Sequence, residues 1–147
     1  MAAISKSARP RTTVAAEDYL EKIEQLISRK GYARVVDIAA ELGIAQASVT
    51  AMVQRLDGEG FVKYEKYRGM VLTSTGLEVA RRIAHRHKLL TDFLRAIGIA
   101  DEKVIYDDVE GMEHHISPET FAAIEALTRY LEKNPAVVAK AATAARR

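Results

Sequence analysis

Three short amphipathic segments followed by a β-rich hairpin restrict the first half of this chain to few folds. Apolar residues recur at helical spacing in residues 15–29, 34–42 and 44–57, and Gly31 and Gly43 end the first two segments. The core-facing side of the third segment is predicted to consist of Val49, Met52, Val53 and Leu56. Two helices joined by a tight glycine-containing turn are the pattern of a helix-turn-helix, which predicts that element over residues 34–57.

The hairpin follows the third helix directly. Residues 60–64 and 69–73 are rich in β-branched and aromatic side chains, and the short polar stretch Glu65–Arg68 separates them. A hairpin in this position is the wing of a winged helix. Lys63, Lys66 and Arg68 would then be available to DNA phosphates or to a minor groove.

The exposed side of the third helix has the chemistry of a DNA-reading surface. It carries small and amide side chains without acids, so it can approach DNA closely. Glutamine pairs with adenine through two hydrogen bonds, and alanine or a threonine methyl contacts the methyl of thymine. An ordinary solvated helix face remains the alternative. The predicted DNA-binding residues are Arg34, Gln46, Ala47, Ser48, Thr50, Gln54, Arg55, Lys66 and Arg68.

The second half of the chain is predicted to be entirely helical. A long helix over about residues 76–97, a helix over about 101–115 and a helix ending near Lys133 follow one another. Ser117-Pro118 opens the last of these, because serine is a good N-cap and proline suits the first helical position. Asn134-Pro135 then interrupts the helix before an alanine-rich, basic tail.

The stretch Glu110-Gly-Met-Glu-His-His115 is the candidate functional site of this half. On a helix, Glu110, Glu113 and His114 stand at i, i+3 and i+4 and project from one face. Carboxylates and an imidazole converging in this way suit a divalent metal ion, which takes deprotonated ligands. A solvated acidic helix face is the alternative, and His115 points about 100° further round the helix, as a structural residue would.

Composition excludes some classes of site. The 147 residues contain no cysteine, which excludes disulfides, zinc ribbons and a thiolate nucleophile. There is no signal peptide or apolar run of transmembrane length, so we expect a cytoplasmic protein with no membrane partner. The net charge is only +2, so an interaction with nucleic acid must rest on local charge placement.

The order of these motifs resembles the diphtheria-toxin-repressor family of metal-dependent transcription regulators, and its manganese-responsive branch most closely. The likeness spans about residues 15–133. The matching stretches are Glu17-Asp-Tyr-Leu-Glu21, Lys30-Gly-Tyr-Ala-Arg34, Ser48-Val-Thr50, Tyr64-Glu-Lys-Tyr-Arg-Gly69, Arg86-His87 and Asp108-Val-Glu-Gly-Met-Glu-His-His115.

The resemblance implies a mostly α fold with four regions. These are a flexible basic arm over residues 1–14, a winged-helix DNA-binding domain over 15–75, a helical dimerisation and metal-binding domain over 76–134, and the basic tail over 135–147. It further implies a homodimer that represses metal-transport genes by binding palindromic operators on double-stranded DNA. No enzyme activity and no small organic substrate are expected.

The resemblance also implies a site for two metal ions. Its ligands would be Asp18, Glu21, His87, Glu110, Glu113 and His114. Iron-responsive relatives place a methionine where Asp18 stands and a cysteine where Glu110 stands. The two hard oxygen donors here favour Mn²⁺, with Fe²⁺, Zn²⁺ or Cd²⁺ as possible substitutes.

Two other functions remain open at this point. One is a winged-helix regulator that responds to iron or to no metal; a regulator that ignores metal would leave the acidic cluster as ordinary surface. A dinuclear carboxylate enzyme of the ferritin-like kind is the second alternative, but that fold draws Glu and Glu-x-x-His motifs from four long helices. The hairpin after three short helices argues against it.

Overall fold

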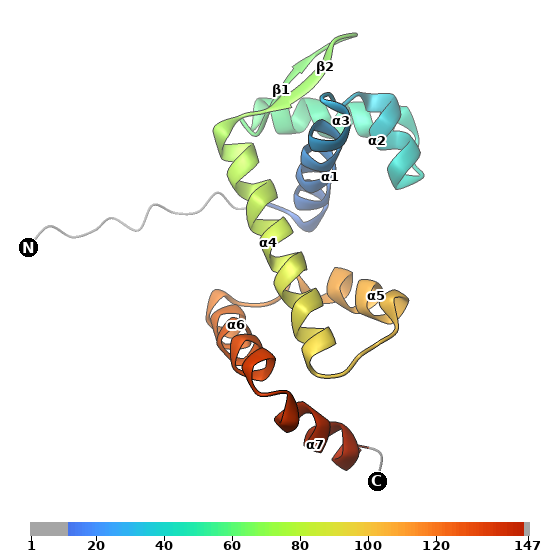
Figure 1. Ribbon diagram of the computed structural model, residues 1–147. Coiled ribbons are helices and arrows are strands. Elements are labelled where there is room, and N and C mark those ends of the chain that lie inside the picture. The colour runs from blue at the N-terminus through green and yellow to red at the C-terminus, as the bar shows by residue number, and fades with distance from the viewer. Residues whose placement is uncertain (1–11, 146–147) are drawn as a thin grey trace, which may run out of the picture. The chain divides into compact units, whose positions relative to one another are not determined.

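A computed structural model describes residues 12–145, which form two compact units divided between Val79 and Ala80. Most of the predicted basic arm, residues 1–11, lies outside the described residues, as do residues 146–147. The elements in chain order (Figure 1) are α1 Val14–Lys30, α2 Val35–Leu42, α3 Gln46–Gly58, β1 Val62–Glu65, β2 Gly69–Leu72, α4 Ser74–Ala96, α5 Glu102–Met112, α6 Pro118–Lys133 and α7 Pro135–Ala145. The predicted mostly helical fold with a helix-turn-helix and a two-stranded wing is confirmed.

The first unit packs α1, α2 and α3 around a common apolar core. Helix α1 begins at the N-cap Thr13, whose hydroxyl accepts a hydrogen bond from the Ala16 amide at 3.2 Å, and ends at Gly31 in the left-handed region. The fully buried side chains include Leu20, Ile23, Leu26, Ile38, Val49, Val53 and Leu56. Met52, which was expected in this core, is only half-buried.

Charged side chains join α1 to α2 at the surface. The Arg29 guanidinium hydrogen-bonds to the Glu41 carboxylate, and the Lys22 ammonium lies 3.4 Å from the same group. The hydrogen bond from Arg29 is the main cause that lowers the pKa of Glu41. This contact therefore stabilises the fold above the ordinary pKa of a glutamate, and the effect disappears as the pH falls through the lowered value.

The wing is a short antiparallel ladder attached to the helices. Strand β1 pairs with β2 from Val62 opposite Leu72 to Glu65 opposite Gly69. The Met70 amide also donates to the Ala33 carbonyl at 3.1 Å, which fixes the wing to the segment between α1 and α2. The hairpin is thus held in place beside the helix-turn-helix.

Gly76, in the first turn of α4, is the most closely approached of the described glycines. A Cβ atom there would lie 1.9 Å from the Phe61 carbonyl oxygen, so any side chain must displace backbone. We expect Gly76→Ala to lower the free energy of unfolding by roughly 1–3 kcal/mol or more, as overpacking does. Denaturant unfolding measures the change.

Gly58→Ala is the matched control. A Cβ atom on Gly58, the last residue of α3, would meet no atom within 4 Å. We expect a change of at most about 1 kcal/mol, in the stabilising direction, because alanine is the better helix former. Equal destabilisation by both substitutions would contradict the close approach at Gly76.

The second unit contains most of α4 together with α5, α6 and α7. Its core includes Leu90 and Leu94 from α4 and Ile105 and Val109 from α5, with Ile124 of α6 packed against them. Ser117 caps α6 as predicted, because its hydroxyl accepts from the Thr120 amide at 3.1 Å. This core sets α5 against α4, which brings their polar side chains together.

One expectation for this half was wrong in detail. Helix α5 ends at Met112 rather than near His115, and the Arg86 guanidinium binds the carbonyl oxygens of Glu113 and Ile116 that follow it. The alanine-rich tail is helical over Pro135–Ala145, since proline is tolerated in the first turn of a helix.

No single helix in residues 12–145 is long and apolar enough to cross a membrane. Helices α2 and α3 together are long and apolar enough, but the chain bends by 117° between them.

Candidate metal centre and nucleic-acid interface

Helices α4 and α5 bring three potential metal ligands together in the second unit. His87 projects from the middle of α4, Glu110 from the last turn of α5, and Glu113 from the residue that caps α5. One ligand atom from each of these side chains lies within 4.8 Å of the other two. The distances from His87 Nδ1 are 3.1 Å to Glu113 Oε2 and 3.5 Å to Glu110 Oε1.

Glu113 is the unusual member of this cluster, because its carboxylate is completely buried. Its Oε1 accepts no hydrogen bond from the described residues, and His114 Nε2 lies 3.4 Å away without hydrogen-bonding geometry. A buried carboxylate with an unsatisfied oxygen is destabilising unless a cation compensates it. The donor set of two carboxylates and an imidazole therefore fits a divalent metal ion.

Arg86 holds this end of α5 in place. Its guanidinium donates to the Glu113 carbonyl at 2.8 Å and to the Ile116 carbonyl at 3.0 Å, and it lies 5.5 Å from the centroid of the Phe121 ring. A cation that binds carbonyls beyond a helix C-terminus is doubly favoured, by hydrogen bonding and by the helix dipole. Arg86 thus connects α4, the Glu113 backbone and the start of α6. The sequence motif contained Arg86, but nothing local indicated this role.

Arg86→Met is expected to weaken metal binding by about 10–100-fold, the usual effect of removing a group that orients a ligand. Arg86→Lys, which keeps the charge and one donor, should fall between that variant and the wild type. Isothermal titration with Mn²⁺ measures the affinity. Arg81→Met is the matched control, since Arg81 is exposed on the same helix. Wild-type affinity in Arg86→Met would contradict the role of Arg86.

The other three predicted ligands occupy different environments. His114 has an almost buried side chain, 3% exposed, in the turn after α5. Asp18 and Glu21 lie three residues apart on α1, both partly buried, and belong to the first unit. The structure therefore brings together His87, Glu110 and Glu113, with His114 next to Glu113. His115 is exposed.

The predicted DNA-reading residues are exposed on α3 and the wing of the first unit. Gln46, Ala47, Ser48 and Gln54 are exposed and Thr50 is half-buried, all on α3. Arg34 is the N-cap of α2, and its guanidinium lies 4.7 Å from the centroid of the Tyr32 ring. This side of α3 can approach a base edge without an acidic side chain in the way.

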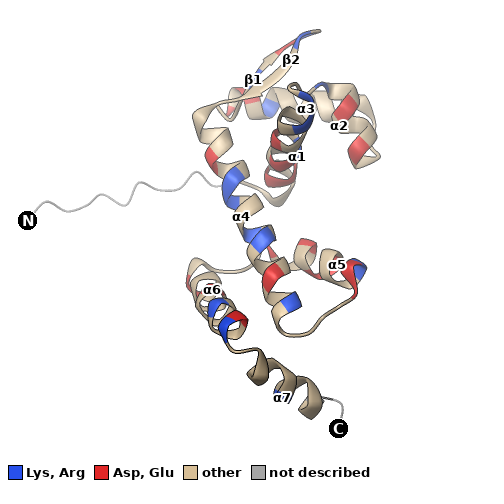
Figure 2. Cartoon of the chain, in the orientation of Figure 1, with Lys and Arg blue, Asp and Glu red and all other residues tan. Residues whose placement is uncertain are grey.

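The basic residues predicted to contact DNA differ in how closely they pair with acidic residues of the same chain. Arg55 binds Glu59 within the chain at 2.7 Å, whereas Arg68 lies 3.4 Å from Glu65 at the exposed tip of the wing. Figure 2 marks basic residues in blue near the tip of the hairpin and acidic residues in red along α5. Lys66 and Arg68 are therefore better placed than Arg55 to meet a phosphate.

Comparisons with known proteins agree with a DNA-binding first unit and a metal-binding second unit. Residues 11–70 match the family described as iron dependent repressor, N-terminal DNA binding domain, and residues 73–138 match its metal binding and dimerisation domain. The HTH-type transcriptional regulator MntR of Bacillus subtilis is 52% identical over 125 residues, which cover 85% of this chain and 87% of that protein. MntR of Lysinibacillus sphaericus is 50% identical over 128 residues, covering 87% and 91%.

A solved structure of the manganese regulator SloR superposes with a TM-score of 0.69 at 27% identity, covering 78% of this chain. The present chain spans about half, 54%, of that longer protein. The two family domains cover nearly all of the described residues and include every predicted site residue. The chain therefore belongs to the iron dependent repressor family, with an N-terminal DNA-binding domain followed by a metal-binding and dimerisation domain.

Proposed function

We propose that this protein is a manganese-dependent transcriptional repressor, which binds palindromic operators of metal-transport genes as a homodimer. The single observation that carries the proposal is the His87–Glu110–Glu113 cluster with its buried, unsatisfied carboxylate oxygen, in a chain that also carries a helix-turn-helix. The names of the relatives support manganese as the metal, since MntR and the manganese regulator SloR are similar to this chain.

The proposed ligand set adds Asp18, Glu21 and His114 to the cluster, for two metal ions per chain. Its support is donor chemistry, because four carboxylates and two imidazoles match hard divalent ions. If Asp18, Glu21, Glu110 and Glu113 share one site, their four negative charges would repel one another, and two divalent cations would supply the charge that neutralises them.

The proposed metal ligands come from both domains of the chain, which suggests how metal binding would regulate DNA binding. His87 and Glu113 join α4 to α5, while Asp18 and Glu21 belong to α1, which packs with the DNA-reading helices. Shared metal ligands would couple the metal-binding domain to the DNA-binding domain. Coupling free energies of this kind are typically about 1–3 kcal/mol.

Exposed apolar side chains support dimerisation through the second unit. Large apolar residues with exposed side chains there include Val104, Tyr106, Leu127, Tyr130 and Val137. One winged helix reads only one half-site, so a palindromic operator requires a two-fold symmetric pair of them.

Selection of binding sites from random duplex DNA tests this proposal. The full chain is incubated with the duplexes in Mn²⁺ or in chelator, and light scattering reports its oligomeric state. We expect a dimer that enriches an inverted repeat with Mn²⁺ only. A monomer, a single non-repeated site, or equal enrichment in chelator would contradict it.

A further inference from the structure

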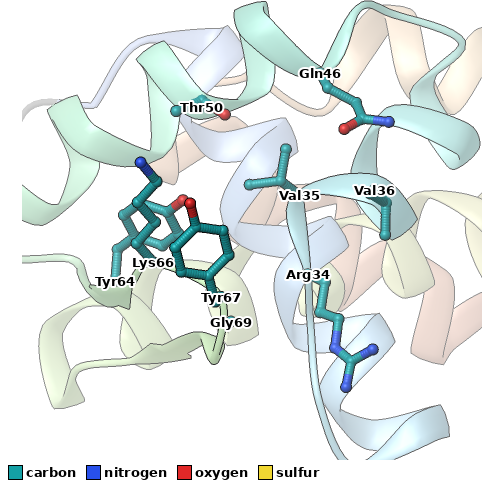
Figure 3. Close-up of a pocket in the computed structure, with 9 residues that line it drawn as sticks. All are labelled: Arg34, Val35, Val36, Gln46, Thr50, Tyr64, Lys66, Tyr67 and Gly69. Carbon is teal, nitrogen blue, oxygen red and sulfur yellow. The ribbon is translucent and has the colours of Figure 1, made fainter.

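A groove separates the wing from the start of α2 and α3 within the first unit (Figure 3). We call it the wing groove; its volume is about 370 Å³. Val35, Val36, Gln46 and Thr50 line it from the helices, and Tyr64, Lys66 and Tyr67 line it from the wing. The rings of Tyr64 and Tyr67 lie next to each other, with Val35 and Thr50 opposite, whereas the Arg34 side chain points away from the two rings (Figure 3).

Tyr67, at the tip of the wing, has a backbone conformation that tyrosine rarely adopts. Its φ is +69°, and it is the only non-glycine residue with a positive φ in the described chain. The Arg68 amide donates to the Glu65 carbonyl at 3.0 Å, so Tyr67 is the third residue of a four-residue turn. A positive φ at the third residue and not at the second, Lys66, is the pattern of a type II turn, which favours glycine or asparagine at the third position.

Among residues 12–145, no contact compensates this conformation by burying the ring, because Tyr67 is 91% exposed. The Lys66 ammonium lies 5.2 Å from the centroid of the ring. Residues with unfavourable backbone conformations cluster at binding sites. The conformation of Tyr67, together with its exposed aromatic ring, therefore indicates a role in binding rather than in stabilising the fold.

The lining of the wing groove fits a polyanion with an apolar component. It contains two basic residues, Arg34 and Lys66, and no acid. By contrast, the hollow on the other side of the wing, lined in part by Lys63, Arg68 and Val71, also contains Glu65. The apolar surface of Val35 and the tyrosine rings suits a deoxyribose, while hydroxyl and ammonium groups are the usual donors to phosphate oxygens.

We propose that the wing groove holds a stretch of the sugar–phosphate backbone of duplex DNA, and that Tyr67 is a DNA contact. The Tyr67 ring lies against a deoxyribose and its hydroxyl donates to a phosphate, with Lys66 held beside it by the ring. This inference rests on the proposed DNA-binding function and adds a contact that is independent of base sequence.

Tyr67 variants test this inference, with DNA affinity and melting temperature measured on the same Mn²⁺-loaded protein. Tyr67→Gly and Tyr67→Asn suit a positive φ, so we expect a melting temperature equal to or above that of the wild type. Both should weaken binding to the operator and to random duplex alike, by about tenfold per wing, as for loss of a hydrogen bond to a charged group. Tyr67→Phe should lose the hydroxyl contribution only.

Salt dependence separates Tyr67 from Lys66. Lys66→Gln should reduce the slope of log affinity against log salt by about 0.9 per phosphate contact, whereas Tyr67→Phe should leave the slope unchanged. Val71→Ala, on the other side of the wing, is the control and should bind as the wild type does.

The outcomes distinguish this inference from the proposed function. If the wild type binds no DNA with Mn²⁺, the proposed function fails. If the wild type binds and Tyr67→Gly and Tyr67→Asn bind equally well, the wing groove assignment alone is overturned. A loss confined to one base-pair sequence would also overturn it, because it would make Tyr67 a base contact.

Discussion

Glu113→Gln is expected to abolish the response of this protein to metal without destabilising the metal-free fold. The substitution keeps the shape of the side chain and removes its charge. Loss of a group that only orients a ligand usually lowers metal affinity by about 10–100-fold. The loss of affinity in Glu113→Gln should be larger, because Glu113 is itself a proposed ligand. Without metal, the melting temperature should stay equal or rise, since the buried charge with its unsatisfied oxygen is gone.

Thermal unfolding with and without Mn²⁺ measures both effects. A ligand at a hundred times its dissociation constant stabilises a protein by about 2.7 kcal/mol, so the wild type should show a clear increase in melting temperature. Asp107→Asn is the control, because Asp107 is an exposed acid on α5 that pairs with Lys103. If Mn²⁺ raised the melting temperature of Glu113→Gln as much as that of the wild type, Glu113 would not be a metal ligand.

Gln46→Ala and Arg68→Ala are expected to weaken operator binding in two different ways. Gln46 is exposed at the start of α3, and loss of a good bidentate base contact costs about 1–3 kcal/mol on the specific sequence. Binding to random duplex should change little. Arg68, at the tip of the wing, should contribute equally on all sequences, and its loss should reduce the salt dependence.

Fluorescence anisotropy on operator and random duplexes at several salt concentrations separates the two effects. Arg55→Ala provides a comparison, because Arg55 pairs with Glu59 at 2.7 Å, more closely than Arg68 pairs with Glu65 at 3.4 Å, and should matter less than Arg68. Equal losses on both duplexes for Gln46→Ala would refute the assignment of α3 as the reading helix.

The elements of this fold were predictable where the sequence carries local signals. Gly31 and Gly43 end α1 and α2 in the left-handed conformation, and Ser117 caps α6. The end of α5 was not predictable, because the Arg86 contact that terminates it comes from a residue 27 positions earlier in the chain. The start of α7 as a separate helix was not predicted, because Asn134-Pro135 signals both the end of one helix and the possible start of another.

The candidate site was predictable in its residue types but only partly in its environment. The spacing of Glu110 and Glu113 could be recognised in the sequence. The complete burial of Glu113 could not, because it depends on how α5 packs against α4. Tyr67 carried no signal beyond an aromatic residue in a polar turn. Its unusual backbone conformation belongs to the three-residue reversal, Lys66 to Arg68, that the pairing of Glu65 with Gly69 leaves at the tip of the wing.

The most direct test of the central claim is one titration that records bound Mn²⁺ and operator affinity together. The wild-type dimer is held at fixed free Mn²⁺ concentrations, bound metal is counted after equilibrium dialysis, and operator binding is measured by anisotropy in the same samples. We predict that operator affinity rises in parallel with metal occupancy and reaches its plateau at two ions per chain. Full operator affinity in chelator, or two bound ions per chain with no gain in affinity, would contradict a metal-dependent repressor.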